Sequence, residues 1–505
     1  MTAATDPFDD FLVSSGDGAA LQVLLGTLHT FEEGNTSGNV HQVPYKFWDG
    51  ALPKEKTEAL LAKIRGPIEQ AQNDLVTLIC CCAVLTRAGY RNHSLYTGLA
   101  SKIAKAELGT FSSELLQEAC DILHSFSAWT ELSQVAAHGL KHFVRLPKFS
   151  AICSDWIVLA HYRMLMPLFR NNQLEQQHIA AFENTLNGIA EACEITAKNK
   201  LIHQGILAGL RRDPETAVTQ MLGSQNTNGY GIKLFQLAEN IVSPKSLLAE
   251  PHPSYAHRKR HLDIQMTHAD TGRAALLVST DQTYFERYAE KLIESFGFWN
   301  EGAIIHFHCV NFSPCPDLLA RYETIHKVLL NFTVDSQPTI LPASEIFKGY
   351  CAGARYLFLP DYLLHYRKVI VSDIDGLIVK NIDGLWRGDK HAILLSTKLL
   401  DKGQLYGRLI WESIAAGSFG ITDSPDNRDF ALKVSHYLCQ QLDLSEDQNL
   451  SYFFTDQIGL MLSYLGSRNT CIFEKGGAPF TQGLGWGFND DGKKAAKQAT
   501  TDYKK

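Results

Sequence analysis

The chain has 505 residues, of which 45% are hydrophobic and 20% are charged, and its formal net charge is −7. This composition is typical of a globular protein with buried cores, and the length allows two to four domains. A slightly acidic chain has no overall attraction for nucleic acid or for an acidic membrane surface, so we expect neither as a partner.

No targeting or membrane-spanning segment is predicted. Residues 1–18 carry acidic side chains but no basic stretch followed by an apolar one, the pattern of a secretory signal. The most apolar stretch, 152–169, is interrupted by Asp, His and Arg, which favours a buried helix over a membrane span. The eleven cysteines include the run 80–82 but no Cys-x-x-Cys pair, which is typical of reduced thiols. We therefore expect a cytoplasmic protein.

Helical spacing of apolar residues dominates from residue 54 to about residue 240, for example at Leu116, Ala119 and Leu123. The predicted helices are joined by short polar turns, which favours antiparallel pairs stacked as a bundle or solenoid. The pattern is loosely similar to tetratricopeptide repeats, although it has no fixed period. We predict an all-α, repeat-like domain over 1–241.

A different pattern covers 242–272, where three prolines precede the basic run 257–261. Because this segment shows little helical periodicity, we interpret it as an interdomain linker. The basic run is interpreted as a solvated charged segment, with contact to a phosphate as the alternative.

Short apolar strands alternate with amphipathic helices after Gly272. Strands are predicted at 273–279, 303–310, 392–395 and 414–421, near 471–473 and directly before Asp373. Helices are predicted at 285–296, 318–329, 352–364, 429–442 and 457–465. This alternation predicts an α/β domain over 273–490, with a mostly parallel sheet, helices on both faces and ligands at the carboxyl ends of strands. The lysine-rich tail, 491–505, is expected to be disordered.

The stretch 369–379, VIVSDIDGLIV, carries the strongest chemical signal in the chain. Asp373 and Asp375 follow a run of apolar residues, and their spacing puts both side chains on one face of an extended strand. Two such carboxylates repel each other, and their hard oxygen atoms suit Mg²⁺ or Mn²⁺. The pair is a candidate metal site, with an exposed acidic turn as the alternative.

Two known families place Asp-x-Asp after a buried strand, and this stretch resembles both. In glycosyltransferases of the GT-A fold, the pair holds a metal on the diphosphate of a nucleotide sugar. In haloacid dehalogenase-like phosphatases the motif continues as Asp-x-Asp-Gly-Thr, and its first Asp is the nucleophile. Gly376 matches the phosphatase motif, whereas Leu377 stands in place of its Thr.

The surrounding segments favour the glycosyltransferase. Four of them resemble parts of glycosyltransferase family 8 in the family's order: 279–284 its nucleotide-binding turn, 354–364 its segment with Arg and Pro-Asp-x-Leu, 416–417 its Asn-Ala-Gly turn, and 456–457 its Asp-Gln pair. The resemblance covers Arg273 to about Phe480. About a hundred residues of α/β pattern precede Asp373, whereas a phosphatase nucleophile opens its domain.

The resemblance implies a role for each matching residue. Asp373 and Asp375 would hold Mn²⁺ or Mg²⁺. The donor would be bound by Thr280, Asp281 and Tyr284 at its base or ribose, by Arg355 at its diphosphate or sugar, and by Ala416 and Gly417. Asp456 and Gln457 would lie near the anomeric carbon as the catalytic pair. The alternatives are a helix N-cap for Asp456 and a surface ion pair for Arg355.

Two departures from the family concern the sugar and the metal. Ala415 stands where the family has Asn, and no histidine follows His436 to act as the third metal ligand. Glu474 is the candidate replacement. The glycine-rich segment 483–487 is interpreted as a terminal loop. The alternative is that this segment folds over the donor and that Lys475 reaches the diphosphate.

The sequence therefore favours a GT-A-like, metal-dependent glycosyltransferase behind a helical domain. The resemblance implies a UDP-sugar donor and retention of anomeric configuration, and the helical domain could bind a protein or glycan acceptor. The alternatives are a phosphatase with Asp373 as nucleophile, and a non-catalytic scaffold of transferase fold.

Overall fold

The computed structural model describes residues 100–103, 105, 113–143, 145–192, 195–342, 344–397, 399–400, 408–448, 454–476 and 481–483. The cysteine run 80–82, the segment 484–487 and the tail 491–505 lie outside these residues. The chain divides into two compact units, one of Met1–Leu207 and Gly223–Glu239 and one of Ala208–Leu222 and Asn240–Lys505.

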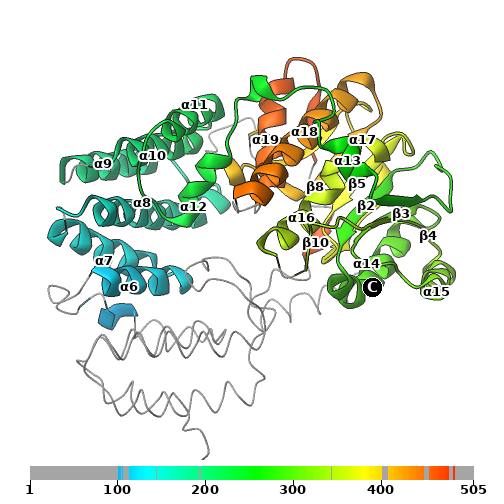
Figure 1. Cartoon of the computed structure of the whole chain (residues 1–505), viewed down its shortest axis with the longest axis horizontal. Coiled ribbons are helices and arrows are strands. Elements are labelled where there is room, and N and C mark those ends of the chain that lie inside the picture. The colour runs from blue at the N-terminus through cyan, green and yellow to red at the C-terminus, as the bar shows by residue number, and fades with distance from the viewer. Residues whose placement is uncertain are drawn as a thin grey trace, which may run out of the picture. The chain divides into compact units, whose positions relative to one another are not determined.

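The described part of the first unit is helical, as the apolar spacing predicts (Figure 1). Its helices are α6 (Ser113–Ser125), α7 (Trp129–His142), α8 (Pro147–Arg170), α9 (Gln176–Ala192), most of α10 (Ala197–Leu210), and α12 (Lys233–Gln236). Residues 149–160 of α8 are all buried, which confirms a buried helix in this stretch. No described helix is both long and apolar enough to cross a membrane.

Asp155 is the acid that interrupts the apolar pattern of α8, and it is fully buried. Its Oδ1 pairs with Nε2 of His203 at 2.7 Å and accepts a hydrogen bond from Nδ2 of Asn199 at 2.9 Å. Its Oδ2 accepts from the backbone N–H of Ile232 at 3.0 Å. A buried carboxylate requires such partners, and these fasten the chain before α12 to α8 and α10.

The second unit begins with 208–222, which includes most of α11 (Pro214–Gln225). Within this unit, Nη2 of Arg212 donates to the carbonyl of Leu399 at 2.6 Å, and Arg468 forms an ion pair with Glu215. The segment 208–222 therefore bonds to residues that lie about 190 and 250 positions further along the chain.

Eight strands of the described residues form one sheet in the order β1-β4-β3-β2-β5-β8-β7-β9. Their bounds are β1 (Leu262–Gln265), β2 (Ala275–Thr280), β3 (Ile304–Val310), β4 (Leu329–Asp335), β5 (Lys368–Ser372), β7 (Ile393–Thr397), β8 (Ile414–Thr422) and β9 (Phe473–Lys475). Neighbours from β4 to β5 are parallel, as are β7 and β9, whereas β1 and β8 are antiparallel to their neighbours. The predicted β/α alternation is confirmed, with a sheet that is more mixed than expected.

Helices cover both faces of this sheet, as predicted (Figure 1). On one face, α14 (Gln282–Asn300) and α15 (Pro316–His326) enclose an apolar core with Leu276, Val278 and Phe307. On the other, α16 (Glu345–Leu357) and α17 (Leu359–Tyr362) pack against β2 and β3, and α18 (Pro425–Gln448) and α19 (Thr455–Ser467) lie beside them. Alternate residues of β2 and β3 therefore face different helices.

The face under α16 and α17 carries a buried polar layer on β3 and β4. His308 bonds through Nε2 to Oδ2 of Asp335 at 2.9 Å and through Nδ1 to the hydroxyl of Tyr362 at 2.6 Å. The hydroxyl of Tyr350 donates to the same Asp335 oxygen at 2.6 Å. Because each group has a partner, these side chains are stable inside the sheet unit.

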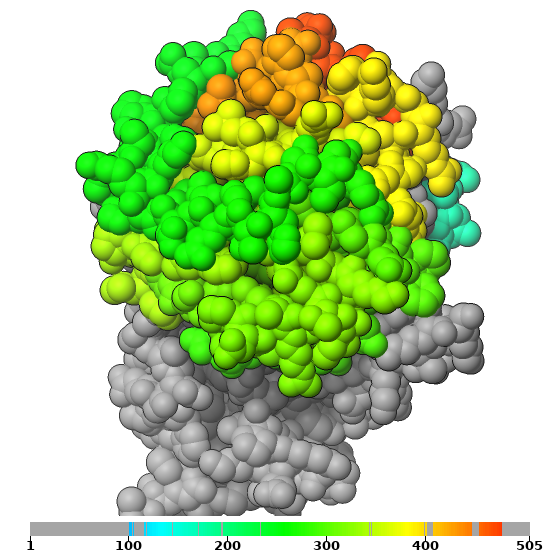
Figure 2. All heavy atoms as spheres, turned by 90° about the vertical axis from the view of Figure 1, so that its right-hand side faces the viewer, coloured from blue at the N-terminus to red at the C-terminus, as the bar shows by residue number. Residues whose placement is uncertain are grey.

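The expected linker, 242–272, is instead part of the sheet unit. It contains the 3₁₀ turn η4 (Pro244–Ser246), helix α13 (Tyr255–Lys259) and strand β1, and its green residues lie across the face shown in Figure 2. Arg258, within the basic run, is 4% exposed and pairs with Asp443 and Glu446 of α18. The interpretation of this run as a solvated segment is wrong for Arg258, because its partners lie far away in the sequence.

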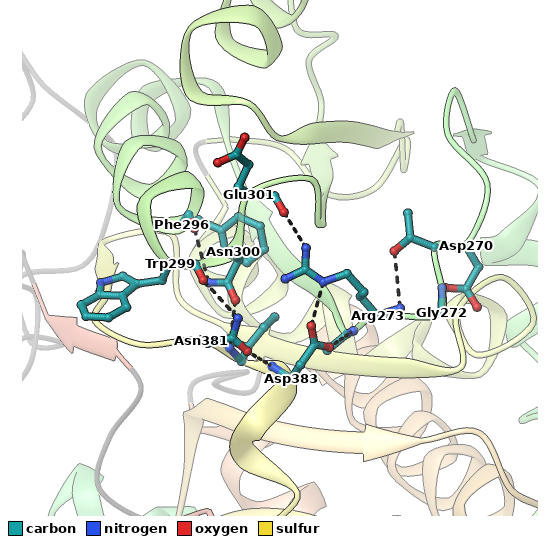
Figure 3. Close-up of polar contacts among 12 residues, drawn as sticks. Asp270, Gly272, Arg273, Phe296, Trp299, Asn300, Glu301, Asn381 and Asp383 are labelled. Atoms are coloured by element: carbon teal, nitrogen blue, oxygen red, sulfur yellow. Dashed lines mark hydrogen bonds and ion pairs between the residues drawn. The ribbon is translucent and has the colours of Figure 1, made fainter.

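The amino edge of the sheet is fastened by a network around Asp383, in the 3₁₀ turn η5 (Asp383–Leu385) (Figure 3). Its carboxylate accepts from Nε of Arg273 at 2.8 Å and from the backbone N–H of Ala274 at 2.7 Å. Asn381 donates to the carbonyl of Trp299 at 3.1 Å, at the end of α14. These contacts fix the start of β2, and they lie at the opposite edge of the sheet from the carboxyl ends of the parallel strands.

Candidate functional site

The strand order contains a point of reversal between β2 and β5. From β2 the chain moves outward through β3 to β4, and then returns across the sheet to β5 on the other side of β2. Ligands of open α/β sheets bind beyond the carboxyl ends of the strands at such a point. Asp281 follows β2 directly and Asp373 follows β5 directly, so the two predicted motifs meet at this edge.

Asp373 lies between a buried guanidinium and a glycine. Nη2 of Arg355, on α16, donates to its Oδ1 at 2.5 Å, and Nη1 of the same side chain donates to the carbonyl of Ser372. Gly417, on β8, faces the other oxygen so closely that a Cβ at this position would overlap Oδ2. The side chain of Asp373 is 37% exposed and that of Arg355 only 2%, so within this pair it is the carboxylate that solvent reaches.

Asp456, at the start of α19, belongs to the same group of charges. Burial raises its pKa from 3.8 to about 6; the Arg355 charge and the N–H of Gln457 act against this rise, and the Asp373 charge adds to it. For Arg355, burial alone lowers the pKa, but the nearby Asp373 carboxylate leads the effects that raise it overall. The structure thus brings Arg355, Asp373 and Asp456 together, as the resemblance implies.

The predicted segment on β8 joins this group through Tyr356. The hydroxyl of Tyr356, which follows Arg355 on α16, donates to the carbonyl of Ala416. Burial raises the pKa of Tyr356 well above its ordinary value, so it remains a neutral donor. Tyr356 was not predicted as a site residue, although its place beside Arg355 in the motif was a usable signal.

Gln457 is held by the chain just before and at the start of β8. In the amide orientation that satisfies its neighbours, its nitrogen donates to the carbonyls of Trp411 and Ile414, both at 3.1 Å. Asp456 is not the N-cap of α19, since Phe454 occupies that position with φ of 61°. Positive φ is rare for a bulky residue, and backbone strain of this kind often occurs at functional sites.

Four buried polar atoms on the elements of this site have no hydrogen-bond partner among the described residues. They are Nε of Arg355, Oγ of Ser279 near the end of β2, Oγ of Ser463 on α19, and Nε1 of Trp411, in the 3₁₀ turn η6 (Ile410–Glu412) before β8. A buried polar atom without a partner is costly and marks a place that a ligand or water completes. Ser279 opens the segment 279–284 but was not predicted as a site residue, and the sequence around Trp411 has no distinctive pattern.

The turn 279–284, which was predicted to bind the nucleotide, has a structural role at the start of α14. Oδ1 of Asp281 caps α14 by accepting from the N–H of Tyr284 at 2.8 Å, and the hydroxyl of Thr280 donates to the carbonyl of Asp281 at 2.9 Å. The ring of Tyr284 packs against Tyr288, with centroids 5.4 Å apart. These contacts fix the turn at the reversal point of the sheet.

Asp375 and Glu474 do not come together as metal ligands. Asp375 lies in the turn that leads into β6 (Gly376–Ile378), which pairs with β10 (Thr481–Gly483). Glu474 lies on β9, and its Oε1 accepts from the N–H of Asp389 at 2.8 Å. Within the described ranges no three or more His, Cys, Asp or Glu side chains form a group that could hold a metal.

The prediction of Glu474 as a third ligand is therefore wrong. Pairing with β7 places β9 at the far edge of the sheet, three strands from β5. Lys475 lies on the same edge strand, in register with Leu395 of β7. Its predicted contact with the diphosphate stays a prediction.

Comparison with known proteins gives partial matches. No protein-family model and no curated protein matches the chain. The matches among solved structures include glycosyltransferase GlyE of Streptococcus pneumoniae TIGR4, with 15% identity and a TM-score of 0.27 over 40% of this chain and 46% of that one. The apo form of the same enzyme matches with 16% identity and a TM-score of 0.26 over 41% and 46% of the two chains. The chain thus spans less than half the length of these structures.

Proposed function

We propose that the protein is a metal-dependent glycosyltransferase that takes its sugar from a nucleotide-sugar donor. The observation that carries the proposal is the cluster of Arg355, Asp373 and Asp456 beyond the carboxyl end of β5, at the reversal point of the sheet. Four sequence segments that resemble one transferase family supply this cluster and its neighbours.

Asp373 and Asp375 are the residues that would hold the cation. Magnesium-like cations are commonly bound by one or two carboxylates together with substrate phosphates and water, so a pair without a third protein ligand fits them. When bound, the cation would stabilise the negative charge that builds on the departing nucleoside diphosphate.

The remaining residues act on the donor directly. Asp281 and Tyr284 would meet the base or ribose at the end of β2, while Gly417 leaves the space that the Asp373 carboxylate occupies. Asp456, mostly ionised above its pKa of about 6, would place negative charge near an oxocarbenium-like anomeric carbon, together with the amide of Gln457. The family resemblance extends this proposal in three respects. The donor would be a UDP-sugar, the anomeric configuration would be retained, and the helical unit would bind a protein or glycan acceptor.

The geometry disfavours the phosphatase alternative. Asp373 follows the last of the four neighbouring parallel strands in chain order, whereas a phosphatase nucleophile follows the first strand of its domain. One oxygen of Asp373 also bonds to a buried guanidinium, which reduces its strength as a nucleophile.

The test is release of nucleoside diphosphate from UDP-glucose, UDP-galactose, UDP-N-acetylglucosamine and GDP-mannose, with Mn²⁺ or with a chelator. We expect Mn²⁺-dependent release from at least one donor, and its loss in Asp373→Asn and Asp375→Asn. Asp263→Asn, the same change on the exposed side of β1, is the matched control and should keep full activity. Hydrolysis of a simple phosphate monoester, with a covalent adduct on Asp373 and no donor cleavage, would overturn the proposal.

A further inference from the structure

Arg355 carries a full positive charge in a place where water does not reach it. Its side chain is 2% exposed, and its direct anionic partner is Asp373, through Nη2 and Oδ1. Nη1 bonds to a neutral carbonyl, of Ser372, and Nε has no partner in the described part of the chain. The position of this charge is therefore set largely by one carboxylate, the one proposed to bind the cation.

The depth of this side chain changes the role that the family resemblance implies for it. An arginine that is 2% exposed and paired with Asp373 has little surface to present to a donor. It instead neutralises this carboxylate through the bond from Nη2 to Oδ1. A charge in this position lowers the affinity of the same carboxylate for a second positive charge.

We propose that Arg355 is an internal counter-ion that occupies Asp373 in the metal-free site and keeps its affinity for a free divalent cation low. The inference rests on the proposed function, since it assumes that Asp373 is a metal ligand. A cation that arrives with a nucleotide diphosphate brings compensating negative charge, so Arg355 opposes its binding less. The site thereby favours the cation–nucleotide pair over the bare cation, a coupling that must be reciprocal.

The experiment measures binding of Mn²⁺ alone to the full-length protein, from the loss of the free-Mn²⁺ signal in electron paramagnetic resonance. Arg355→Gln keeps a hydrogen-bond donor but removes the charge, and we expect it to bind Mn²⁺ at least about tenfold more tightly than the wild type. Arg355→Lys keeps the charge and should bind within about threefold of the wild type. Arg367→Gln, at an 83% exposed arginine before β5, is the matched control and should change nothing.

The possible results distinguish failure of this inference from failure of the proposed function. Equal or weaker Mn²⁺ binding by Arg355→Gln, with Mn²⁺-dependent donor cleavage intact in the wild type, would overturn the inference alone. If no form of the protein binds Mn²⁺ or cleaves a donor, both fail. If Arg355→Gln is too unstable for the binding measurement, the rise in its melting temperature on addition of Mn²⁺ must exceed that of the wild type. An equal or smaller rise would overturn the inference.

Discussion

Gly417 packs directly against the carboxylate of Asp373, and no side chain fits between them. Gly417 lies on β8, and Asp373 directly follows β5, its antiparallel neighbour, where Ser372 is in register with Ser418, so the backbone of β8 fixes the contact. The orientation of the proposed metal ligand thus depends on the absence of a side chain on its neighbour.

We expect Gly417→Ala to displace Asp373 and lower donor cleavage by about 100-fold, because small displacements of reacting groups are costly. The fold should persist, since the Cβ meets the end of a side chain that can move. Gly384→Ala is the matched control, because nothing lies within 4 Å of a Cβ at that position. Cleavage rates and melting temperatures of both variants check this, and full activity in Gly417→Ala would contradict it.

Asp456→Asn should stabilise the metal-free protein at pH 7.5. The folded state holds the Asp456 proton more tightly than the unfolded chain, because burial raises the pKa from 3.8 to about 6. Ionisation of Asp456 therefore costs stability as the pH rises from about 4 to about 6, and the full cost is present above that range. The asparagine removes a cost on the order of 1–3 kcal/mol.

The measurement is urea unfolding of both proteins with a chelator, at pH 4 and at pH 7.5. The gain in unfolding free energy should be present at pH 7.5 and largely absent at pH 4. A difference that is the same at both values would show that ionisation of Asp456 is not its cause.

Asp373→Asn should destabilise the metal-free protein, by about 1–2 kcal/mol. It leaves the buried Arg355 without its ionic partner, and the partial exposure of Asp373 keeps the loss below that of a fully buried pair. The control, Asp263→Asn, should change the unfolding free energy by less than about 0.5 kcal/mol. An increase in stability of Asp373→Asn would mean that repulsion between Asp373 and Asp375 outweighs the pairing with Arg355.

Arg258→Met should lower the unfolding free energy by about 2–3 kcal/mol, because it leaves Asp443 and Glu446 without their shared cation. Lys327→Met is the matched control: its side chain is 69% exposed and that of its partner Glu301 is 66% exposed, so the loss of this pair should cost less than about 1 kcal/mol. Chemical unfolding of the two variants side by side makes the comparison. Equal losses would contradict the structural role of Arg258.

The sequence predicted those parts of the fold that have a local pattern. β2 and β3 were found because each is a short apolar run, and β5 because such a run ends in two acids. β4 was missed, since Asn331 and Asp335 interrupt its apolar pattern. The partners of these two residues, Tyr366 and His308, come from other elements and satisfy them only in the folded chain.

The same distinction holds for the site. Arg355, Asp373 and Asp456 were predicted from motifs, and the structure brings them together. The error over Glu474 arose because nothing in its local sequence shows that β9 pairs with β7 at the edge of the sheet. The burial of Arg355 could not be predicted from the sequence either, because it depends on how α16 packs on the sheet.

The chain passes between its two compact units more than once, because 208–222 belongs with the sheet while 223–239 belongs with the helices. A gene fragment that begins at Asn240 would therefore encode the sheet without α11, and would remove the hydrogen bond from Arg212 to Leu399. Recombination at a single point cannot exchange one unit and leave the other complete. A single cut therefore separates the sheet unit from part of its own chain, the crossing segment 208–222.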